Sequence, residues 1–195
     1  MTTDSEVIRR SRDSPRAFGD LFHRHATVVH RYVARRAGTD VADEVMSETF
    51  LVAFERRERF DHSHTDARPW LLGIATVLLA SYRRREARHL HALARAAKPD
   101  DDDGGLGRVA SRADAAADVR RIATRVQALP DGDRDVLLLH AWADLTGEQI
   151  AAALNIPVGT VRSRLSRARR TLRESPAATT SKEADHGRTD AAATA

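Results

Sequence analysis

Apolar side chains recur at three- and four-residue spacing in the first half of the chain, as in helices with one buried face. One such set precedes a helix end at Gly38. Its members are Phe18, Leu21, Phe22, Val29 and Val33. Further helices are predicted from about Val41 to Arg59 and from about Pro69 to Arg88. Between them, the polar segment Phe60–Arg68 is predicted to be a loop.

The periodic pattern is interrupted once and then stops. Lys98–Gly105 combines a proline, a run of aspartates and two glycines, a composition that predicts a flexible tether. Ser175–Ala195 has no periodicity and is predicted to be disordered. We therefore expect an all-α protein with two small helical domains at residues 14–95 and 113–174, joined by a flexible linker at 96–112.

Composition excludes several classes of protein. The chain of 195 residues has no cysteine, which excludes disulfides, a thiolate zinc site and a catalytic thiol. Met1–Arg12 lacks an apolar signal core, and the most apolar run, Trp70–Tyr82, is too short to span a bilayer, so a soluble cytoplasmic protein is expected. The net charge is +4 and Lys98 and Lys182 are the only lysines. Arginine suits phosphates and guanine edges, so the composition permits nucleic-acid binding.

The strongest local pattern starts at Thr146. Thr146 and Gln149 have capping-box spacing, and Leu145 and Ile150 have the spacing of a hydrophobic staple, so a helix start is predicted there. Asn155 suits the left-handed conformation that ends a helix, and the proline two residues later suits the first turn of the next one. Two helices separated by so short a turn predict a helix-turn-helix.

The second helix of this pair has the pattern of a DNA-recognition helix. Val161, Leu165, Ala168 and Leu172 share one face, and no acidic residue occurs from 157 to 173. Exposed basic helices also occur in proteins that never bind DNA, but the capping box, the turn and the acid-free face together favour DNA. The residues expected to contact it are Gly159, Thr160, Arg162, Ser163, Ser166, Arg167, Arg169 and Arg170.

At this point the chain resembles a known family. Leu129-Pro130, Glu148–Leu154 and Gly159–Arg169 are similar to region four of the sigma factors. Asp43–Phe54, and Arg68–Ala75 followed by three arginines, are similar to region two. The order of the two blocks resembles the extracytoplasmic-function subfamily of the sigma-70 family, and the resemblance covers all but the termini.

The resemblance implies a subunit that binds core RNA polymerase, at its beta-prime clamp and beta flap, and promoter DNA. The helix-turn-helix would recognise the minus-35 element. The clamp would bind an acidic strip with an exposed leucine, which suits a partner that presents basic residues around an apolar spot. Its residues are Asp43, Glu44, Ser47, Glu48 and Leu51.

The first domain is expected to melt the minus-10 element. In this family the loop corresponding to Phe60–Arg68 captures an extruded base, and the binding recovers the cost of extrusion, a few kcal/mol. Thr76, Val77 and Ser81 depart from residues that the family usually has, which puts the downstream contacts in doubt. The residues expected at the melted strand are His62, His64, Trp70, Arg83, Arg84, Arg85 and Arg88.

Two other classes of protein share some of these sequence features. A stand-alone helix-turn-helix regulator would bind its site without polymerase, usually as a dimer, and no heptad seam for a dimer is present. An enzyme or metalloprotein would need a motif that the histidine pairs do not supply, so no catalysis, cofactor or metal is expected. An anti-sigma protein is a further partner that the resemblance suggests.

Overall fold

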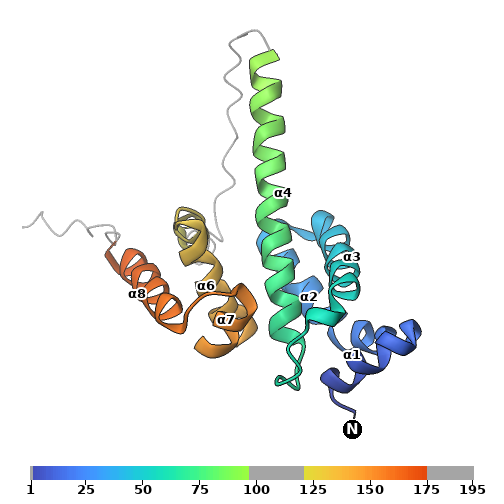
Figure 1. Ribbon diagram of the computed structural model, residues 1–195. Coiled ribbons are helices and arrows are strands. Elements are labelled where there is room, and N and C mark those ends of the chain that lie inside the picture. The colour runs from blue at the N-terminus through green and yellow to red at the C-terminus, as the bar shows by residue number, and fades with distance from the viewer. Residues whose placement is uncertain (1, 97–120, 175–195) are drawn as a thin grey trace, which may run out of the picture.

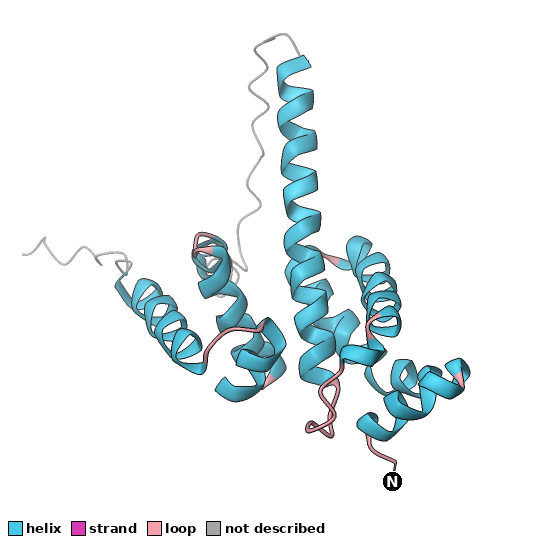
Figure 2. Ribbon diagram, in the orientation of Figure 1, coloured by secondary structure: helices cyan, strands magenta, loops and turns pink. Residues whose placement is uncertain are grey.

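The computed structural model describes residues 2–96 and 121–174, and within these ranges it contains helices and loops but no strand (Figure 2). The expected linker at 96–112, apart from Ala96, and the expected tail at 175–195 lie outside the described residues. The all-α fold class is confirmed.

The first group of helices extends to Ala96. It consists of α1 (Asp4–Asp13), η1 (Pro15–Phe18), α2 (Gly19–Ala37), α3 (Thr39–Glu55), η2 (Arg57–Arg59) and α4 (Arg68–Ala96). The helix expected to run to Arg59 thus ends at Glu55 and is followed by a short 3-10 turn. Gly38, with φ 87°, separates α2 from α3, as the sequence predicted. Helix α4 extends well beyond the others (Figure 1).

Helix α1 was missed in the sequence, where the first helical block was expected to begin at about Ser14. Neighbouring residues nevertheless specify where this helix begins, because Thr3 and Glu6 form a capping box. Val7 and Ile8 follow at once and are fully buried. Two adjacent apolar residues in a charged segment gave too little periodicity, so only the cap could have revealed this helix.

The second group of helices lies on the opposite side of α4 from α3 (Figure 1). Residues 121–127 are helical, and α6 (Asp131–Ala143), α7 (Gly147–Leu154) and α8 (Val158–Glu174) follow. Its core includes Leu139, Leu145, Ile150 and Val161, each at most 1% exposed. Helix α8 packs on α6 and α7, so the recognition helix is held by its apolar face.

The two groups pack directly against each other through α4 and α7. A Cβ built on Gly73 would overlap the backbone carbonyl of Ala153, so this close approach requires glycine on α4. Arg36 of α2 donates to Asp135 of α6, and its side chain is only 1% exposed. The helices on the two sides of α4 therefore share one continuous buried core.

Candidate DNA and polymerase interfaces

The helix-turn-helix forms as predicted. Thr146 Oγ1 accepts from the Gln149 N–H at 3.3 Å, and Gln149 Oε1 accepts from the Thr146 N–H at 2.9 Å. Asn155 ends α7 in the left-handed conformation, with φ 51° and ψ 52°. Pro157 lies one residue before α8, and its carbonyl accepts the N–H groups of Thr160 and Val161. These two hydrogen bonds form the first turn of α8.

The outward face of α8 carries the residues expected at the minus-35 element. Val161 and Ala168 are fully buried against α6 and α7, which fixes the rotation of the helix. Thr160 is half-buried, and its carbonyl accepts from the Ser163 hydroxyl at 3.0 Å. The other expected contacts are exposed: Gly159, Arg162, Ser163, Ser166, Arg167, Arg169 and Arg170.

Residues 157–173 include no acidic residue, but a carboxylate from another helix pairs with Arg167. Its Nε and Nη2 donate to Asp133 of α6 at 2.9 and 2.8 Å, a bidentate pair. The hydrogen bond from Arg167 holds the pKa of Asp133 below its usual value. The acid lies 34 residues away in sequence, so the helix's own composition could not reveal it. Arg167 therefore braces α8 on α6 as well as facing outward.

The expected polymerase-binding strip is accessible on α3. Asp43, Glu44, Ser47 and Leu51 are exposed and Glu48 is half-buried, and Leu51 is 57% exposed. Asp43 also lies 3.4 Å from His30 of α2. Val45, Thr49 and Ala53 on the other side of α3 are buried, so the helix presents the strip to solvent.

The loop before α4 borders a cavity of about 530 Å³. Phe60 is buried, and its ring meets Trp70 edge-on with centroids 5.2 Å apart. Both aromatic residues line the cavity, together with His64. Gln149 and Asn155 of the second group close the opposite side. An aromatic-edged hollow in a polar loop can accept a planar base.

The two loop histidines have different surroundings. His62 does not line the cavity, because its ring lies against α1: Nδ1 is 2.9 Å from Ser5 Oγ and Nε2 is 3.1 Å from Arg12 Nη2. His64 does line the cavity, with a side chain that is 53% exposed. The sequence placed both histidines in one loop but could not separate these roles.

The basic residues of α4 divide in the same way. Arg83 is half-buried and donates to the backbone carbonyl of Arg36 at 2.7 Å, so it lies on the side of α4 that faces α2 and α6. Burial, followed by the charge of Arg36, lowers the pKa of Arg83. Arg84, Arg85 and Arg88 are exposed. The Arg88 Nε donates to the Arg84 carbonyl at 3.2 Å, within the same helix.

Thr76 stands where the family usually has a different residue, and it is buried. Its hydroxyl lies 2.8 Å from the Tyr32 hydroxyl and donates to the Leu72 carbonyl at 2.7 Å. Tyr32 in turn accepts from Arg36 at 2.7 Å. Thr76 is therefore part of the polar network beneath the interface between the helix groups, whereas Val77 is 61% exposed.

One group of metal-type side chains occurs in the described ranges: Asp4, His25 and Asp66 offer atoms within 4.8 Å of one another. Hydrogen bonds account for the central member. Asp4 accepts from Arg24 at 2.8 Å, from His25 at 2.6 Å and from the Ala67 N–H at 3.0 Å.

Among the helices of residues 2–96 and 121–174, none is long and apolar enough to cross a membrane.

This fold and these surfaces define a helical DNA-binding protein with a helix-turn-helix in its second half. Comparison with known families agrees. The family model described as Sigma-70 region 2 matches residues 21–89, and the model described as Sigma-70, region 4 matches residues 120–172. The region 2 match covers helices of the first group, and the region 4 match covers helices of the second group.

Relatives match over most of their length. The chain is 34% identical over 145 residues to the probable RNA polymerase sigma-C factor of Mycobacterium bovis, covering 74% of this chain and 75% of the relative. It is 30% identical to the ECF RNA polymerase sigma-E factor of Salmonella typhimurium, covering 87% of this chain and 92% of the relative. The chain therefore belongs to the extracytoplasmic-function sigma factors of the sigma-70 family.

Solved structures share the fold. The structure of CnrH in complex with the cytosolic domain of CnrY has a TM-score of 0.60 at 24% identity, and covers 87% of this chain and 94% of that one. The sigma factor RpoE of Bartonella quintana, solved in complex with the anti-sigma factor NepR, has a TM-score of 0.57 at 19% identity, with coverages of 80% and 94%. At this identity the likeness concerns the fold alone.

Proposed function

We propose that residues 14–95 bind the polymerase clamp and open the minus-10 element, while 113–174 bind the minus-35 element and the beta flap. As a sigma factor the chain binds core RNA polymerase and directs it to promoters, and region 4 supplies the helix-turn-helix for minus-35 recognition. The observation that carries the residue-level proposal is the pair of outward surfaces, acidic on α3 and basic on α8. They lie on helices of the two groups that pack against each other through α4 and α7.

Helix α8 would enter the major groove at the minus-35 element. Gly159 and Ser163 lie in its N-terminal half and are small enough for base edges to approach. Arg162, Arg169 and Arg170 flank them and would hold phosphates. Asp133 would fix the orientation of the Arg167 side chain, and the N–H groups of Arg167 that do not bind Asp133 would donate to the DNA.

The strip on α3 would bind the clamp. Its carboxylates would meet basic residues, and Leu51, more than half exposed, would fill an apolar spot between them. No step requires bond chemistry in the sigma factor itself, so we propose a non-enzymatic initiation factor that acts in the cytoplasm. An anti-sigma protein is a proposed further partner, since the sigma factor RpoE of Bartonella quintana was solved in complex with the anti-sigma factor NepR.

The proposal is tested by transcription in vitro with core polymerase. Glu48→Arg is expected to abolish co-elution with core polymerase and promoter-specific transcripts, because it reverses a charge in the middle of the strip. The control is Asp13→Arg, which reverses an exposed charge on α1, away from the strip. Circular dichroism checks that both variants keep the helix content.

The alternative, a stand-alone helix-turn-helix regulator, predicts a different result. The isolated chain would then protect a specific site in footprinting without polymerase, and Glu48→Arg would protect it equally well. Full transcription by Glu48→Arg would refute the clamp interface on α3.

A further inference from the structure

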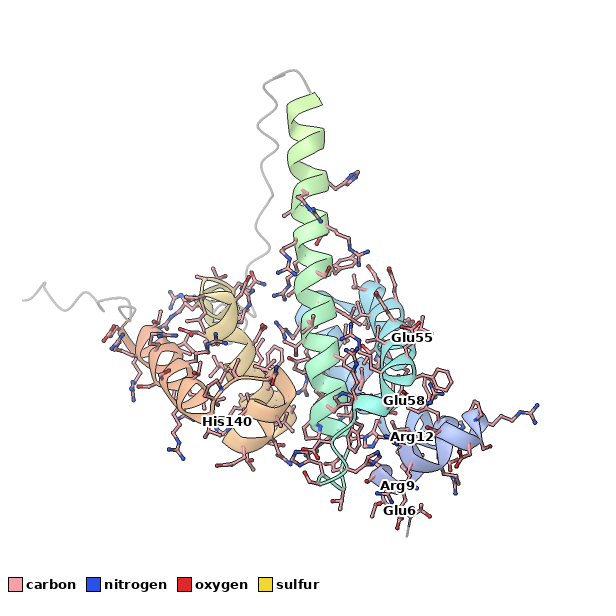
Figure 3. The ribbon with its side chains drawn as sticks, viewed as in Figure 1. Glu6, Arg9, Arg12, Glu55, Glu58 and His140 are labelled. Atoms are coloured by element: carbon pink, nitrogen blue, oxygen red, sulfur yellow. The ribbon has the colours of Figure 1, made fainter. Side chains whose placement is uncertain are left out.

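Helix α1 lies outside the residues that the region 2 model matches, yet it contacts the loop before α4 along much of that loop's length. The Asp4 N–H donates to the Thr65 carbonyl at 3.1 Å, near the loop's end. Arg12 donates to the Glu58 carbonyl at 3.3 Å, just before the loop begins. Figure 3 shows Arg12 and Glu58 as neighbours at the junction of α1 and η2.

Asp4 is the anchor of this contact. It is 7% exposed, and one of its oxygens accepts from both His25 and the Ala67 N–H, while the other accepts from Arg24. Burial opposes ionisation, but these hydrogen bonds outweigh it and hold the pKa of Asp4 below its usual value. A charged carboxylate that accepts three hydrogen bonds thus ties α1 to α2 and to Ala67, the last residue before α4.

His62 is fixed to α1 in one tautomer. Arg12 can only donate, so Nε2 of His62 must accept, and Nδ1 then carries the proton that it donates to Ser5 Oγ. The Ser5 hydroxyl lies 3.5 Å from the His62 carbonyl and can return a bond to the loop backbone. Burial, together with the charges of Arg12 and Arg9, lowers the pKa of His62, so the neutral ring is the stable form at neutral pH.

His64 is left to face the cavity. It lies two residues beyond His62, its N–H donates to the Asp61 carbonyl at 3.1 Å, and its ring lines the cavity with Phe60 and Trp70. An Asx turn, in which the Ser63 N–H donates to Asp61 Oδ1 at 2.9 Å, sets the bend between the two histidines. The contact of His62 with α1 thus holds the loop two residues before His64.

We propose that Asp4, Ser5 and Arg12 are positioning residues for base capture: Ser5 and Arg12 hold the loop through His62, and Asp4 holds its end at Ala67, so that His64 contacts the extruded base. The inference rests on the proposed function of the loop and adds a part of the chain to it. A preformed pocket need not be ordered when the base binds, so a loop held by α1 binds it more tightly.

The test uses holoenzyme assembled from the full chain and core polymerase. Affinity is measured for forked promoter DNAs that differ only in one unpaired non-template base of the minus-10 element. The readout is the ratio of affinities for the best and worst base. Loss of folded protein lowers both affinities equally, whereas a misplaced loop lowers the ratio.

Asp4→Ala is expected to lower this ratio about tenfold, because it removes the charge-assisted hydrogen bond to the loop at the Ala67 N–H. Ser5→Ala removes a single hydroxyl and is expected to act in the same direction by less. Arg10→Ala is the matched control, because Arg10 lies on α1 but pairs with exposed Asp20 and not with the loop. Its ratio should equal that of the wild type.

A comparison of combined variants separates the histidines. In a background with both Ser5→Ala and Arg12→Ala, His62→Ala should have no further effect, because the changes remove the same contacts, whereas His64→Ala should lower the ratio again. Unchanged ratios for Asp4→Ala and Ser5→Ala, beside a loss for His62→Ala alone, would overturn the inference. If the wild type discriminates at no position, the proposed function of the loop fails instead.

Discussion

The two surfaces proposed to bind DNA differ in how far the protein has already fixed them. The loop before α4 is fastened to α1 by hydrogen bonds at both ends and faces α7 across a shared cavity. Helix α8 instead presents exposed arginines, of which Arg167 is bound to Asp133 of α6. The loop thus forms a pocket of fixed shape, whereas α8 forms an exposed basic surface.

This difference matches what each surface must do. A single extruded base offers little surface area for binding. Its capture therefore needs a pocket that folding has already ordered, so that no ordering cost is added when the base binds. Duplex DNA offers a long row of phosphates, and side chains that adjust can follow it from a fixed helix. Rigid contacts are thus placed where one base is read, and adaptable charges where a groove is followed.

The largest expected effect comes from the buried pair that holds the helix groups together. Asp135→Ala leaves the Arg36 guanidinium, 1% exposed, without its carboxylate, and should lower the free energy of unfolding by about 3 kcal/mol. Urea denaturation measures this loss. The control Asp20→Ala breaks the exposed pair with Arg10 and should cost less than about 1 kcal/mol. Equal losses would contradict a structural role for the buried pair.

A smaller effect is expected on α8. Replacing both Arg162 and Arg169 by alanine should flatten the dependence of log affinity on log salt by about 1.8, at about 0.9 for each lost phosphate contact. Binding of the holoenzyme to a duplex minus-35 element is titrated over a range of salt. The control replaces Arg31 and Arg35, exposed on α2, and should leave the slope unchanged. An unchanged slope in the first variant would place these arginines away from phosphates.

The smallest effect concerns the pair between Arg167 of α8 and Asp133 of α6. The folded protein lowers the pKa of Asp133, so its pair with Arg167 stabilises the fold fully above the ordinary value of 3.8 and ceases to do so as the pH falls through the lower, folded value. Asp133→Asn lacks this contribution. The wild type should be the more stable at pH 6, and the difference should shrink below about pH 4. Urea denaturation across this range measures it, and a constant difference would contradict the pairing.

The sequence by itself determined the helix-turn-helix of the second half, because neighbouring residues specify where α7 begins and ends and where α8 begins. Thr146 and Gln149 cap α7 within one turn, and Asn155 ends it. The exposed strip on α3 was also predictable, since helical periodicity separates Asp43 and Leu51 from the buried face. Such local interactions need no knowledge of what packs on top.

Only the tertiary structure decided which polar side chains were already engaged. Asp133 meets Arg167 and Asp135 meets Arg36 across 34 and 99 residues of sequence, and His62 meets Ser5 across 57. No periodicity or capping pattern encodes such pairs, because they depend on how separate helices pack. For the same reason the sequence showed two histidines in one loop, and the fold determined that one supports the loop while the other faces the cavity.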